Sequence, residues 1–289
     1  MNVKDLKYFV KLQELKSYSD TAHYFGVSQP TITYAVKRLE TEYQTELIVR
    51  KSYANSVTLT HAGDQILAHA KKILREDHLM QKDLQRIRDS RIKMGFPPII
   101  TNYLVPLVFD QLRDNDLLSR IEPVRSGSKE LLDKLYNGDI DIALLGTTRI
   151  PENGNFDFNI IKVHNFKIIA SSERQFPKEL KIRDLQNEDV LILDESSVHQ
   201  LIVNNIIEKY NVFTNVIYQT SDYRLLLDLV KRNKGISLIT ETALQVVEGI
   251  QELNVVDETF PPFYIMLIYR SSLKAGPHTQ KIIDIFSEL

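Results

Sequence analysis

Hydrophobic residues recur at helical spacing through the first forty residues of the chain. Apolar side chains stand three and four positions apart over residues 4–15, which predicts an amphipathic helix. A second, shorter helix is predicted over residues 18–25, with Ser19 as its N-cap and Ala22 and Phe25 directed inward. Both apolar faces then need a further element to cover them.

A tight corner and a third helix follow directly. Gly26 can adopt the left-handed backbone of such a corner without a clash. Ser28 is the predicted N-cap, and Pro30 is tolerated in the first turn, where N–H groups lack helical partners. The positions spaced i, i+4 and i+7 that should pack on the first two helices are Ile32, Val36 and Leu39. Two helices around such a corner are typical of a helix-turn-helix, which lays its second helix in the major groove of DNA.

The polar face of the third helix is the predicted DNA-binding surface. Residues 47–60 are predicted to form two short strands around an Asn55–Ser56 turn, which would add a wing. Gln29 suits either bidentate pairing with adenine or a contact with phosphate, whereas Lys37 and Arg38 suit contacts with phosphate. Alternatively, the third helix is an ordinary surface helix that does not contact DNA. The candidate DNA-contacting residues are Ser28, Gln29, Pro30, Thr31, Thr33, Tyr34, Lys37, Arg38 and Arg50.

Residues 62–90 are predicted to form one long helix. Apolar positions spaced alternately four and three apart form a heptad seam, interrupted at Asp77, which either sets the register or marks where paired helices diverge. An exposed stripe of this kind is unstable in water, and one recognition helix reads only a few base pairs, so we expect dimerisation. Alternatively, this long helix packs its apolar seam against other parts of the same chain. The predicted dimerisation residues are Ile66, Ala70, Ile73, Met80, Leu84 and Ile87.

From residue 91 onward the pattern changes to alternating strands and helices. Apolar strands are predicted over 92–96, 120–127 and 139–146, with helices over 99–114 and 128–137. Near-continuous apolar strands that alternate with helices predict a parallel sheet covered on both faces.

An internal similarity predicts that this half of the chain has two lobes. Residues 131–145 and 226–239 both contain a helix, a glycine break and a buried strand. The chain is expected to cross between the lobes near 163–166 and 259–264. A last strand, FYIMLIYR, and a helix over 276–288 would then return to the first lobe.

A small-molecule pocket is predicted between the lobes, where strands end and helices begin. Hydroxyls and unpaired N–H groups at helix starts suit a carboxylate, so the expected effector is a small organic acid, although each residue could instead serve only as an N-cap. A Pro97–Pro98 pair removes N–H donors at one of these starts. The candidates are Pro97, Pro98, Ser126, Ser128, Thr147, Thr148, Ser196, Ser197, His199, Thr220 and Ser221.

Composition and charge agree with a DNA-binding part joined to a separate body. The 289 residues suggest about two domains and contain no cysteine, which excludes disulfides and thiolate sites. Residues 1–93 carry a net charge of +5 and residues 94–289 carry −7, which together give the overall −2. A basic N-terminal third suits a polyanion. No apolar run is long enough for a membrane span, and the N-terminus does not have the pattern of a secretory signal.

Motifs for catalysis, metal binding and cofactor binding are absent from the sequence. The seven histidines show no metal-ligand spacing, and no nucleophile elbow, Walker loop or dinucleotide fingerprint occurs. Asp139 and Asp141 alternate along a predicted strand edge and are interpreted as solubilising residues. We therefore expect no cofactor, no metal and no catalytic residues.

Several of these positions resemble the LysR-type transcriptional regulators. The resemblance lies in Ala22, the run Val27-Ser28-Gln29-Pro30, Leu39-Glu40, Leu47, Arg50, Leu59-Thr60 and Ala62-Gly63. It covers about 60 residues closely and the remainder more loosely, chiefly through LYNGDIDIALLG.

The resemblance implies a fold and a set of partners. The fold class is an α/β main body, a two-lobed periplasmic-binding-protein-like effector domain, preceded by an all-α winged helix-turn-helix and a long linker helix. The implied domains are 1–60 (DNA-binding), 61–90 (linker) and 91–289 (effector-binding). Lobe I then comprises about 91–163 and 265–289, and lobe II about 164–264. Implied partners are double-stranded promoter DNA, a small-molecule effector, RNA polymerase and further copies in a dimer or tetramer, in the bacterial cytoplasm.

Two other classes of protein are alternatives. One is an intracellular solute-binding protein with an appended helical bundle that never touches DNA. The other is an α/β enzyme acting on a small molecule, which requires a catalytic constellation that the sequence does not contain. DNA binding that is lost when residues 1–60 are removed would separate a regulator from both.

Overall fold

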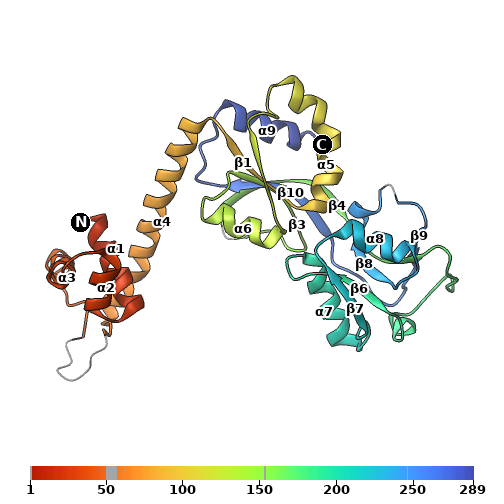
Figure 1. Cartoon of the computed structure of the whole chain (residues 1–289), viewed down its shortest axis with the longest axis horizontal. Coiled ribbons are helices and arrows are strands. Elements are labelled where there is room, and N and C mark those ends of the chain that lie inside the picture. The colour runs from red at the N-terminus through yellow and green to blue at the C-terminus, as the bar shows by residue number, and fades with distance from the viewer. Residues whose placement is uncertain (1, 50–56, 153, 246) are drawn as a thin grey trace. The chain divides into compact units, whose positions relative to one another are not determined.

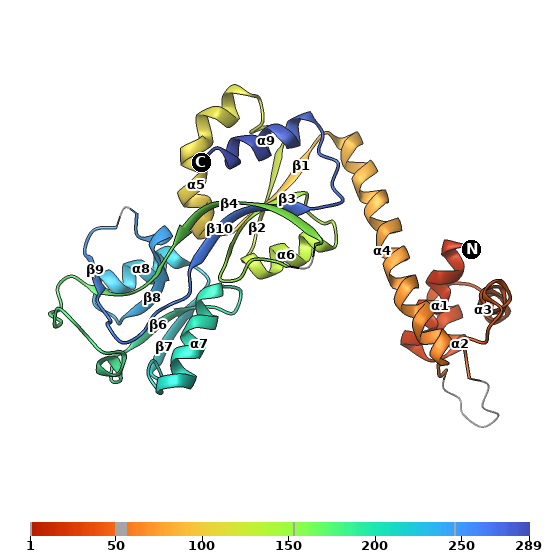
Figure 2. The same ribbon diagram turned by 180° about the vertical axis from the view of Figure 1, so that it is seen from behind.

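The computed structural model describes residues 2–49, 57–152, 154–245 and 247–289. The chain forms two compact units, residues 1–85 and residues 86–289, here called the N-terminal and C-terminal units. Figures 1 and 2 show that the N-terminal unit is helical, whereas the C-terminal unit combines helices with sheets.

The N-terminal unit begins with the helices α1 (Val3–Leu15), α2 (Tyr18–Phe25) and α3 (Gln29–Tyr43). Gly26, between α2 and α3, has φ of 62°, which confirms the left-handed corner. The apolar faces of the helices meet in one buried cluster that includes Leu6, Phe9, Leu12, Ile32, Val36 and Leu39. The third helix therefore covers the other two, as its spacing predicts.

The N-cap of α2 is Ser17 and not Ser19. The Ser17 hydroxyl accepts a hydrogen bond from the backbone N–H of Asp20 at 3.2 Å, and Ser17 has an extended backbone. Ser19 lies inside the helix, because α2 begins one residue before it. Ser28 occupies the N-cap position of α3 as predicted, but its hydroxyl contacts the Thr31 hydroxyl at 2.9 Å rather than a backbone N–H.

An antiparallel bridge between Ile48 and Leu59 joins the two ends of the predicted wing. The backbone N–H of Val49 donates to the carbonyl of Thr58 at 2.8 Å beside this bridge. Arg50 and the predicted Asn55–Ser56 turn lie outside the described residues.

The predicted heptad seam lies along the long helix α4 (His61–Asp89) and has two parts with different environments. Ile66, Ala70 and Ile73 pack into the core of the N-terminal unit, and Ala70 is 1% exposed. For these three positions, packing against the same chain therefore replaces the predicted exposed seam. Asp77, where the seam is interrupted, forms an ion pair with Lys7 of α1 at 3.0 Å. The exposed fractions in the second part are 56%, 54% and 74% for Met80, Leu84 and Ile87.

Lobe I of the C-terminal unit is built on a five-stranded sheet in the order β2-β1-β3-β10-β4. Strands β2, β1 and β3 are parallel, as predicted, but β10 runs antiparallel to both β3 and β4, so the sheet is mixed. The physical reason is that the chain enters β10 from the other lobe and not through a crossover helix of lobe I. The elements of lobe I are β1 (Ile92–Phe96), α5 (Pro98–Asp114), β2 (Ile121–Arg125), α6 (Ser128–Tyr136), β3 (Ile142–Thr147), β4 (Phe156–His164), β10 (Phe263–Arg270) and α9 (Pro277–Ser287).

Alternate residues of β3 and β10 face opposite layers of lobe I. Ile142 and Leu144 lie in the cluster that contains the apolar residues of α5 and α9. Ala143 and Leu145 lie in the cluster under α6. The two-residue period of a strand thus buries both faces of the sheet and explains why these strands are almost continuously apolar.

Lobe II contains two smaller sheets, β8-β5-β9 and β6-β7. A parallel bridge between Val190 and Ile236 joins them. The helix–strand pairs α6–β3 and α8–β8 correspond to the two similar sequence segments. The elements of lobe II are β5 (Phe166–Ser171), η1 (Ile182–Leu185), β6 (Val190–Leu193), α7 (Val198–Tyr210), β7 (Val216–Thr220), α8 (Tyr223–Lys231), β8 (Ser237–Thr240), η2 (Glu241–Ala243) and β9 (Ile250–Leu253).

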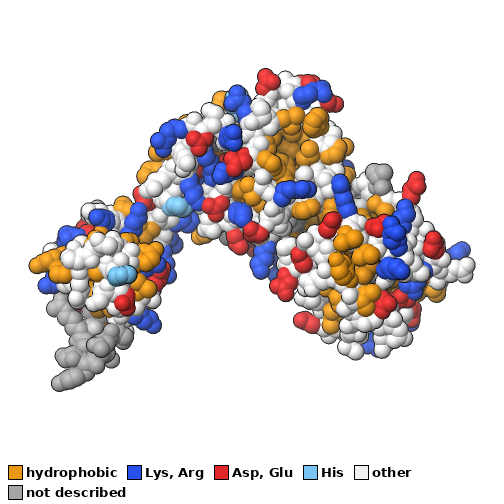
Figure 3. Space-filling view, viewed as in Figure 1, with side chains coloured by type: hydrophobic (Ala, Val, Ile, Leu, Met, Phe, Trp, Pro, Cys, Tyr) orange, Lys and Arg blue, Asp and Glu red, His pale blue; other side chains and the backbone are white. Residues whose placement is uncertain are grey.

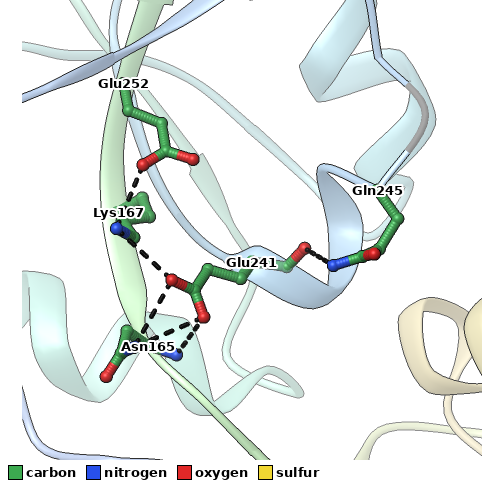
Figure 4. A network of polar contacts seen from close by, with 5 residues as sticks. All are labelled: Asn165, Lys167, Glu241, Gln245 and Glu252. Carbon is green, nitrogen blue, oxygen red and sulfur yellow. Dashed lines mark hydrogen bonds and ion pairs between the residues drawn. The ribbon is translucent and has the colours of Figure 1, made fainter.

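The chain first crosses between the lobes at Asn165, between β4 and β5. Figure 4 shows the carboxylate of Glu241 beside this residue, where it accepts a hydrogen bond from the Asn165 backbone N–H at 2.9 Å. Lys167 pairs with Glu241 at 3.3 Å and with Glu252 at 3.0 Å. These contacts join Asn165 and the start of β5 to η2 and β9 of lobe II.

Asp141 is a buried structural residue and not the solubilising one that its strand-edge position predicted. It is 5% exposed, pairs with the guanidinium of Arg86 and accepts a hydrogen bond from the Lys93 backbone N–H at 2.8 Å. Burial raises the pKa of the Asp141 carboxyl, and Arg86 opposes that rise. Arg86 also donates to the carbonyl of Gly138, so it ties the last turn of α4 to the start of β3.

Candidate DNA-binding surface and effector cavity

The outward face of α3 presents four of the predicted DNA-contacting side chains to solvent. Gln29, Pro30 and Lys37 are exposed, and Tyr34 is 61% exposed. The hydroxyl of Thr33 donates to the carbonyl of Gln29 at 3.3 Å, which occupies its proton within the helix. This surface offers amide, aromatic and ammonium groups on one helix face, which is the chemistry that a recognition helix uses.

Arg38 is engaged by its own chain, unlike the free outward cation that the sequence predicts. Its Nε and Nη2 atoms donate to the two carboxylate oxygens of Asp5 at 2.9 and 2.5 Å. Asp5 is only 3% exposed, and this bidentate pair joins α3 to α1. The carboxylate raises the pKa of Arg38. Arg38 therefore has a structural role in positioning α3.

A cavity of about 280 Å³ lies between the two lobes of the C-terminal unit. It is bounded by the N-termini of four helices, α5 and α6 from lobe I and α7 and α8 from lobe II. The residues that line it are Pro97, Pro98, Ile99, Ile100, Arg125, Ser126, Gly127, Ser128, Glu130, Leu193, Asp194, Ser196, Ser197, Val198, His199, Ser221, Tyr223 and Phe263. Unpaired N–H groups at helix starts favour negative charge in such a place.

The structure brings most of the predicted effector residues together. Pro97, Pro98, Ser126, Ser128, Ser196, Ser197, His199 and Ser221 all line the cavity. Thr147, Thr148 and Thr220 do not. The Thr147 hydroxyl exchanges hydrogen bonds with the backbone of Arg149, and the Thr220 hydroxyl accepts from the backbone N–H of Asp222 at 3.0 Å. The hydroxyls of Thr147 and Thr220 therefore stabilise their own turns.

Three of the lining serines are already hydrogen-bonded within their own lobes. Ser126 donates to the carboxylate of Glu130, which Lys134 also binds, and these two partners lower the pKa of Glu130. The hydroxyl of Ser128 accepts from the Gly146 backbone N–H at 3.0 Å. Ser196 donates to Asp194 at 2.5 Å. Both cavity carboxylates are thus partly satisfied before any ligand binds.

His199 lines the cavity but is almost fully buried, and both of its ring nitrogens are occupied. It is 3% exposed, and its ring contacts those of Phe166 and Phe263. Nε2 accepts the Thr240 backbone N–H at 3.2 Å, and Nδ1 lies 2.7 Å from the hydroxyl of Ser197. Burial lowers the pKa of His199 to about 3, so the ring is neutral at neutral pH. Neither ring nitrogen of His199 is free for the predicted effector contact, which stays a prediction.

The sequence analysis missed Arg125, the basic side chain of this cavity. It ends β2 at the carboxyl edge of the sheet, is exposed, and forms no ion pair with the residues that the structure describes. The predicted residues were chosen for hydroxyl groups at helix starts, so a cation at a strand end was not among them. A charged residue that ends a parallel strand just before a helix was the available signal.

The two lobes are in close contact at Gly127. A Cβ atom on this residue would lie 2.2 Å from the carbonyl oxygen of Ser196, which leaves no room for a side chain. On another side of the contact between lobes, the amide of Asn102 on α5 donates to the hydroxyl of Tyr223 on α8 at 2.6 Å. Backbone atoms of Gly127 from lobe I and of Ser196 from lobe II therefore both contribute to the cavity wall.

Other kinds of site are not found in the described ranges. No group of three or more potential metal ligands comes together within them. No described helix has the length and apolar character needed to cross a bilayer.

Comparisons with known proteins agree with both parts of the molecule. Residues 3–64 match the "bacterial regulatory helix-turn-helix protein, lysR family", and residues 86–289 match the "LysR substrate binding domain". The chain is 32% identical, over all of its length and 99% of the relative, to the malolactic fermentation system transcriptional activator of Lactococcus lactis. It is 25% identical to the hydrogen peroxide-inducible genes activator of Haemophilus influenzae, over 84% of this chain and 81% of that one.

Solved structures share the fold. OxyR of Corynebacterium glutamicum matches with a TM-score of 0.53 and 22% identity, over 99% of this chain and 92% of that one. Full-length CbnR complexed with its target DNA matches with a TM-score of 0.51 and 18% identity, over 100% and 99%. The matching families and relatives are regulators and not enzymes. From its helix-turn-helix to its two-lobed body, the chain belongs to the LysR family of transcriptional regulators.

Proposed function

We propose that this regulator binds promoter DNA through α3 and responds to a small organic acid held between its two lobes. The observation that carries the effector class is the composition of the cavity: four helix N-termini and the guanidinium of Arg125, which has no ion-pair partner among the described residues, surround about 280 Å³. A carboxylate satisfies both kinds of donor. The volume suits a ligand smaller than a drug-sized molecule.

The relative from Lactococcus lactis narrows the first acids to test. Its name assigns it to the malolactic fermentation system, whose chemistry connects malate with lactate. L-Malate, L-lactate and succinate therefore form the first panel, since they differ in carboxylate number and in the hydroxyl group.

The proposed mechanism is a shift between arrangements of the two lobes. An acid that contacts both lobes favours the arrangement in which those contacts are made. Its differential affinity limits how far the equilibrium moves. The change would alter how DNA-binding units of an oligomer engage the promoter and RNA polymerase in the bacterial cytoplasm.

Exposed apolar surface supports self-association into a dimer or tetramer. Met80 and Ile87 on α4 are largely exposed. Figure 3 shows hydrophobic side chains gathered over α5 and α8, where Leu107 and Phe109 of α5 are 56% and 45% exposed. Patches of this kind on a soluble unit are typical of interaction surfaces.

The test combines DNA binding with ligand binding on the full chain. Fluorescence anisotropy with DNA from upstream of the protein's own gene should give an affinity that falls steeply with salt. A panel acid at 100 times its dissociation constant should stabilise the protein by about 2.7 kcal/mol in thermal unfolding and change the DNA affinity. Salt-insensitive or absent DNA binding would refute the regulator, and an unresponsive melting temperature would refute these effectors.

A further inference from the structure

The hydrogen bonds around His199 fix the position of its single ring proton. The backbone N–H of Thr240 can only donate, so Nε2 of His199, 3.2 Å away, must be the unprotonated acceptor. A neutral imidazole carries one proton, which therefore resides on Nδ1. Nδ1 lies 2.7 Å from Oγ of Ser197, so this N–H donates to the serine.

The same geometry fixes what the Ser197 hydroxyl can do. Its oxygen accepts from Nδ1 of His199 and also from the His199 backbone N–H at 3.3 Å. Two accepted hydrogen bonds occupy both lone pairs of a hydroxyl oxygen. The hydroxyl proton is then the group that Ser197 has left to offer, and Ser197 lines the cavity.

We propose that His199 is a positioning residue that makes Ser197 a hydrogen-bond donor, and not an acceptor, toward the effector. The inference rests on the proposed function, because it concerns the same cavity. A hydroxyl that can only donate favours a ligand group that accepts without donating, which an ionised carboxylate does and a primary amide does not. Arg125, which also only donates, works in the same direction.

The first test reads the ring proton directly. In long-range ¹H–¹⁵N spectra of the full chain labelled with ¹⁵N-histidine, one buried histidine should show a protonated Nδ1 and an unprotonated Nε2. His199→Gln identifies the signal by removing it. A protonated Nε2 on His199 would overturn the inference, whatever the ligand proves to be.

The second test measures discrimination between acids and amides. Calorimetry compares L-malate, L-lactate and succinate with malamide, lactamide and succinamide. Ser197→Ala should lower the preference for acid over amide about tenfold, because a hydrogen bond to a charged group is lost. Thr148→Ala is the matched control, since this hydroxyl-bearing residue lies outside the cavity and should leave the preference unchanged.

Two conservative variants separate positioning from simple packing. His199→Asn retains an N–H donor near the Nδ1 position and should keep most of the preference. His199→Gln retains an acceptor near the Nε2 position but loses that donor, and should behave like Ser197→Ala. Equal effects of both variants on discrimination would overturn the inference.

The outcomes distinguish this inference from the proposed function. If an acid binds and Ser197→Ala keeps its preference over the amide, only the inference fails. If none of the three acids binds, the proposed effector class and the inference about Ser197 both fail for these acids.

Discussion

Two adjacent basic residues of α3 have different tasks. Lys37 is exposed and forms no ion pair with a described residue, whereas Arg38 pairs bidentately with the buried carboxylate of Asp5. The sequence placed both on one polar face, because helical periodicity reports direction and not partners. Asp5 is 33 residues away, and nothing local indicates the pair.

Substitution of these two residues should separate DNA binding from stability. Lys37→Gln should weaken binding to all DNA sequences alike and lower the slope of log affinity against log salt by about one, because one phosphate contact is lost. Its melting temperature should be unchanged. Arg38→Gln should lower the melting temperature, because it leaves Asp5 buried without its cation. Equal salt slopes for Lys37→Gln and the wild type would remove Lys37 from the interface.

The buried imidazole of His199 should make the protein less stable in acid. Its ring stays neutral in the folded chain down to a pKa of about 3, whereas the unfolded chain takes up a proton below about 6.5. Between these values the unfolded state binds more protons, so stability falls as the pH falls. At pH 5 the loss should be about 2 kcal/mol relative to neutral pH.

Urea unfolding of the wild type and His199→Gln at pH 7 and pH 5 measures this effect. The variant lacks the titrating ring, so its loss between the two pH values should be smaller by that amount. The lowered pKa of His164, which burial also causes, acts in the same direction in both proteins and cancels in the comparison. An equal loss of stability from pH 7 to pH 5 in the wild type and in His199→Gln would show that His199 is not the buried titrating group.

At the scale of elements, α4 combines two environments in one helix. Its first half contributes Ile66, Ala70 and Ile73 to the core of the N-terminal unit, and its second half presents Met80 and Ile87 to solvent. The heptad spacing is regular through both halves. The sequence pattern alone therefore could not show that the seam changes from a core contact to an open surface.

Charged substitutions in the two halves should have opposite consequences. Met80→Glu combined with Ile87→Glu should dissociate the oligomer without lowering the helix content, because exposed apolar contacts between copies are lost. Ala70→Glu should instead unfold the N-terminal unit, because it buries an unpaired charge. Light scattering after gel filtration gives the mass, and circular dichroism gives the helix content. An unchanged mass for the double variant would place the interface elsewhere.

How much could be predicted differs from one element to another. The corner at Gly26 and strand β3 follow from local spacing and from backbone preference, and both are confirmed. The antiparallel course of β10 depends on the route between lobes, which periodicity does not record. Asp141 was misjudged for a similar reason, because its partner Arg86 lies 55 residues away.

The candidate effector site was predicted best where general geometry decides it. The rule that ligands gather at strand ends and helix starts predicted Ser128 and Ser197, and both residues line the cavity. It failed for Thr148, which lies just beyond a strand end but outside the cavity. Arg125 was missed because the chemistry sought was a hydroxyl, although a cation binds a carboxylate more strongly.

At the scale of the whole effector-binding unit, the two lobes approach at Gly127. Gly127→Ala should reduce affinity for the effector tenfold or more, because the added methyl would lie 2.2 Å from the Ser196 carbonyl oxygen and keep the lobes apart. The circular dichroism spectrum should be unchanged, since the backbone of Gly127 has φ of −68°, which alanine also adopts. Calorimetry with the panel acids measures the loss. Undiminished affinity would show that binding does not need this close approach.

The placement of β10 between β3 and β4 has a consequence for synthesis on the ribosome. Helices α1 to α3 are complete once residue 43 has been made, and α4 is complete once residue 89 has been made. The lobe I sheet lacks an inner strand until residue 270, so two strand edges stay unpaired through the translation of all of lobe II. The N-terminal unit can therefore fold early, whereas the unpaired edges of β3 and β4 make nascent lobe I prone to aggregation until β10 has been made.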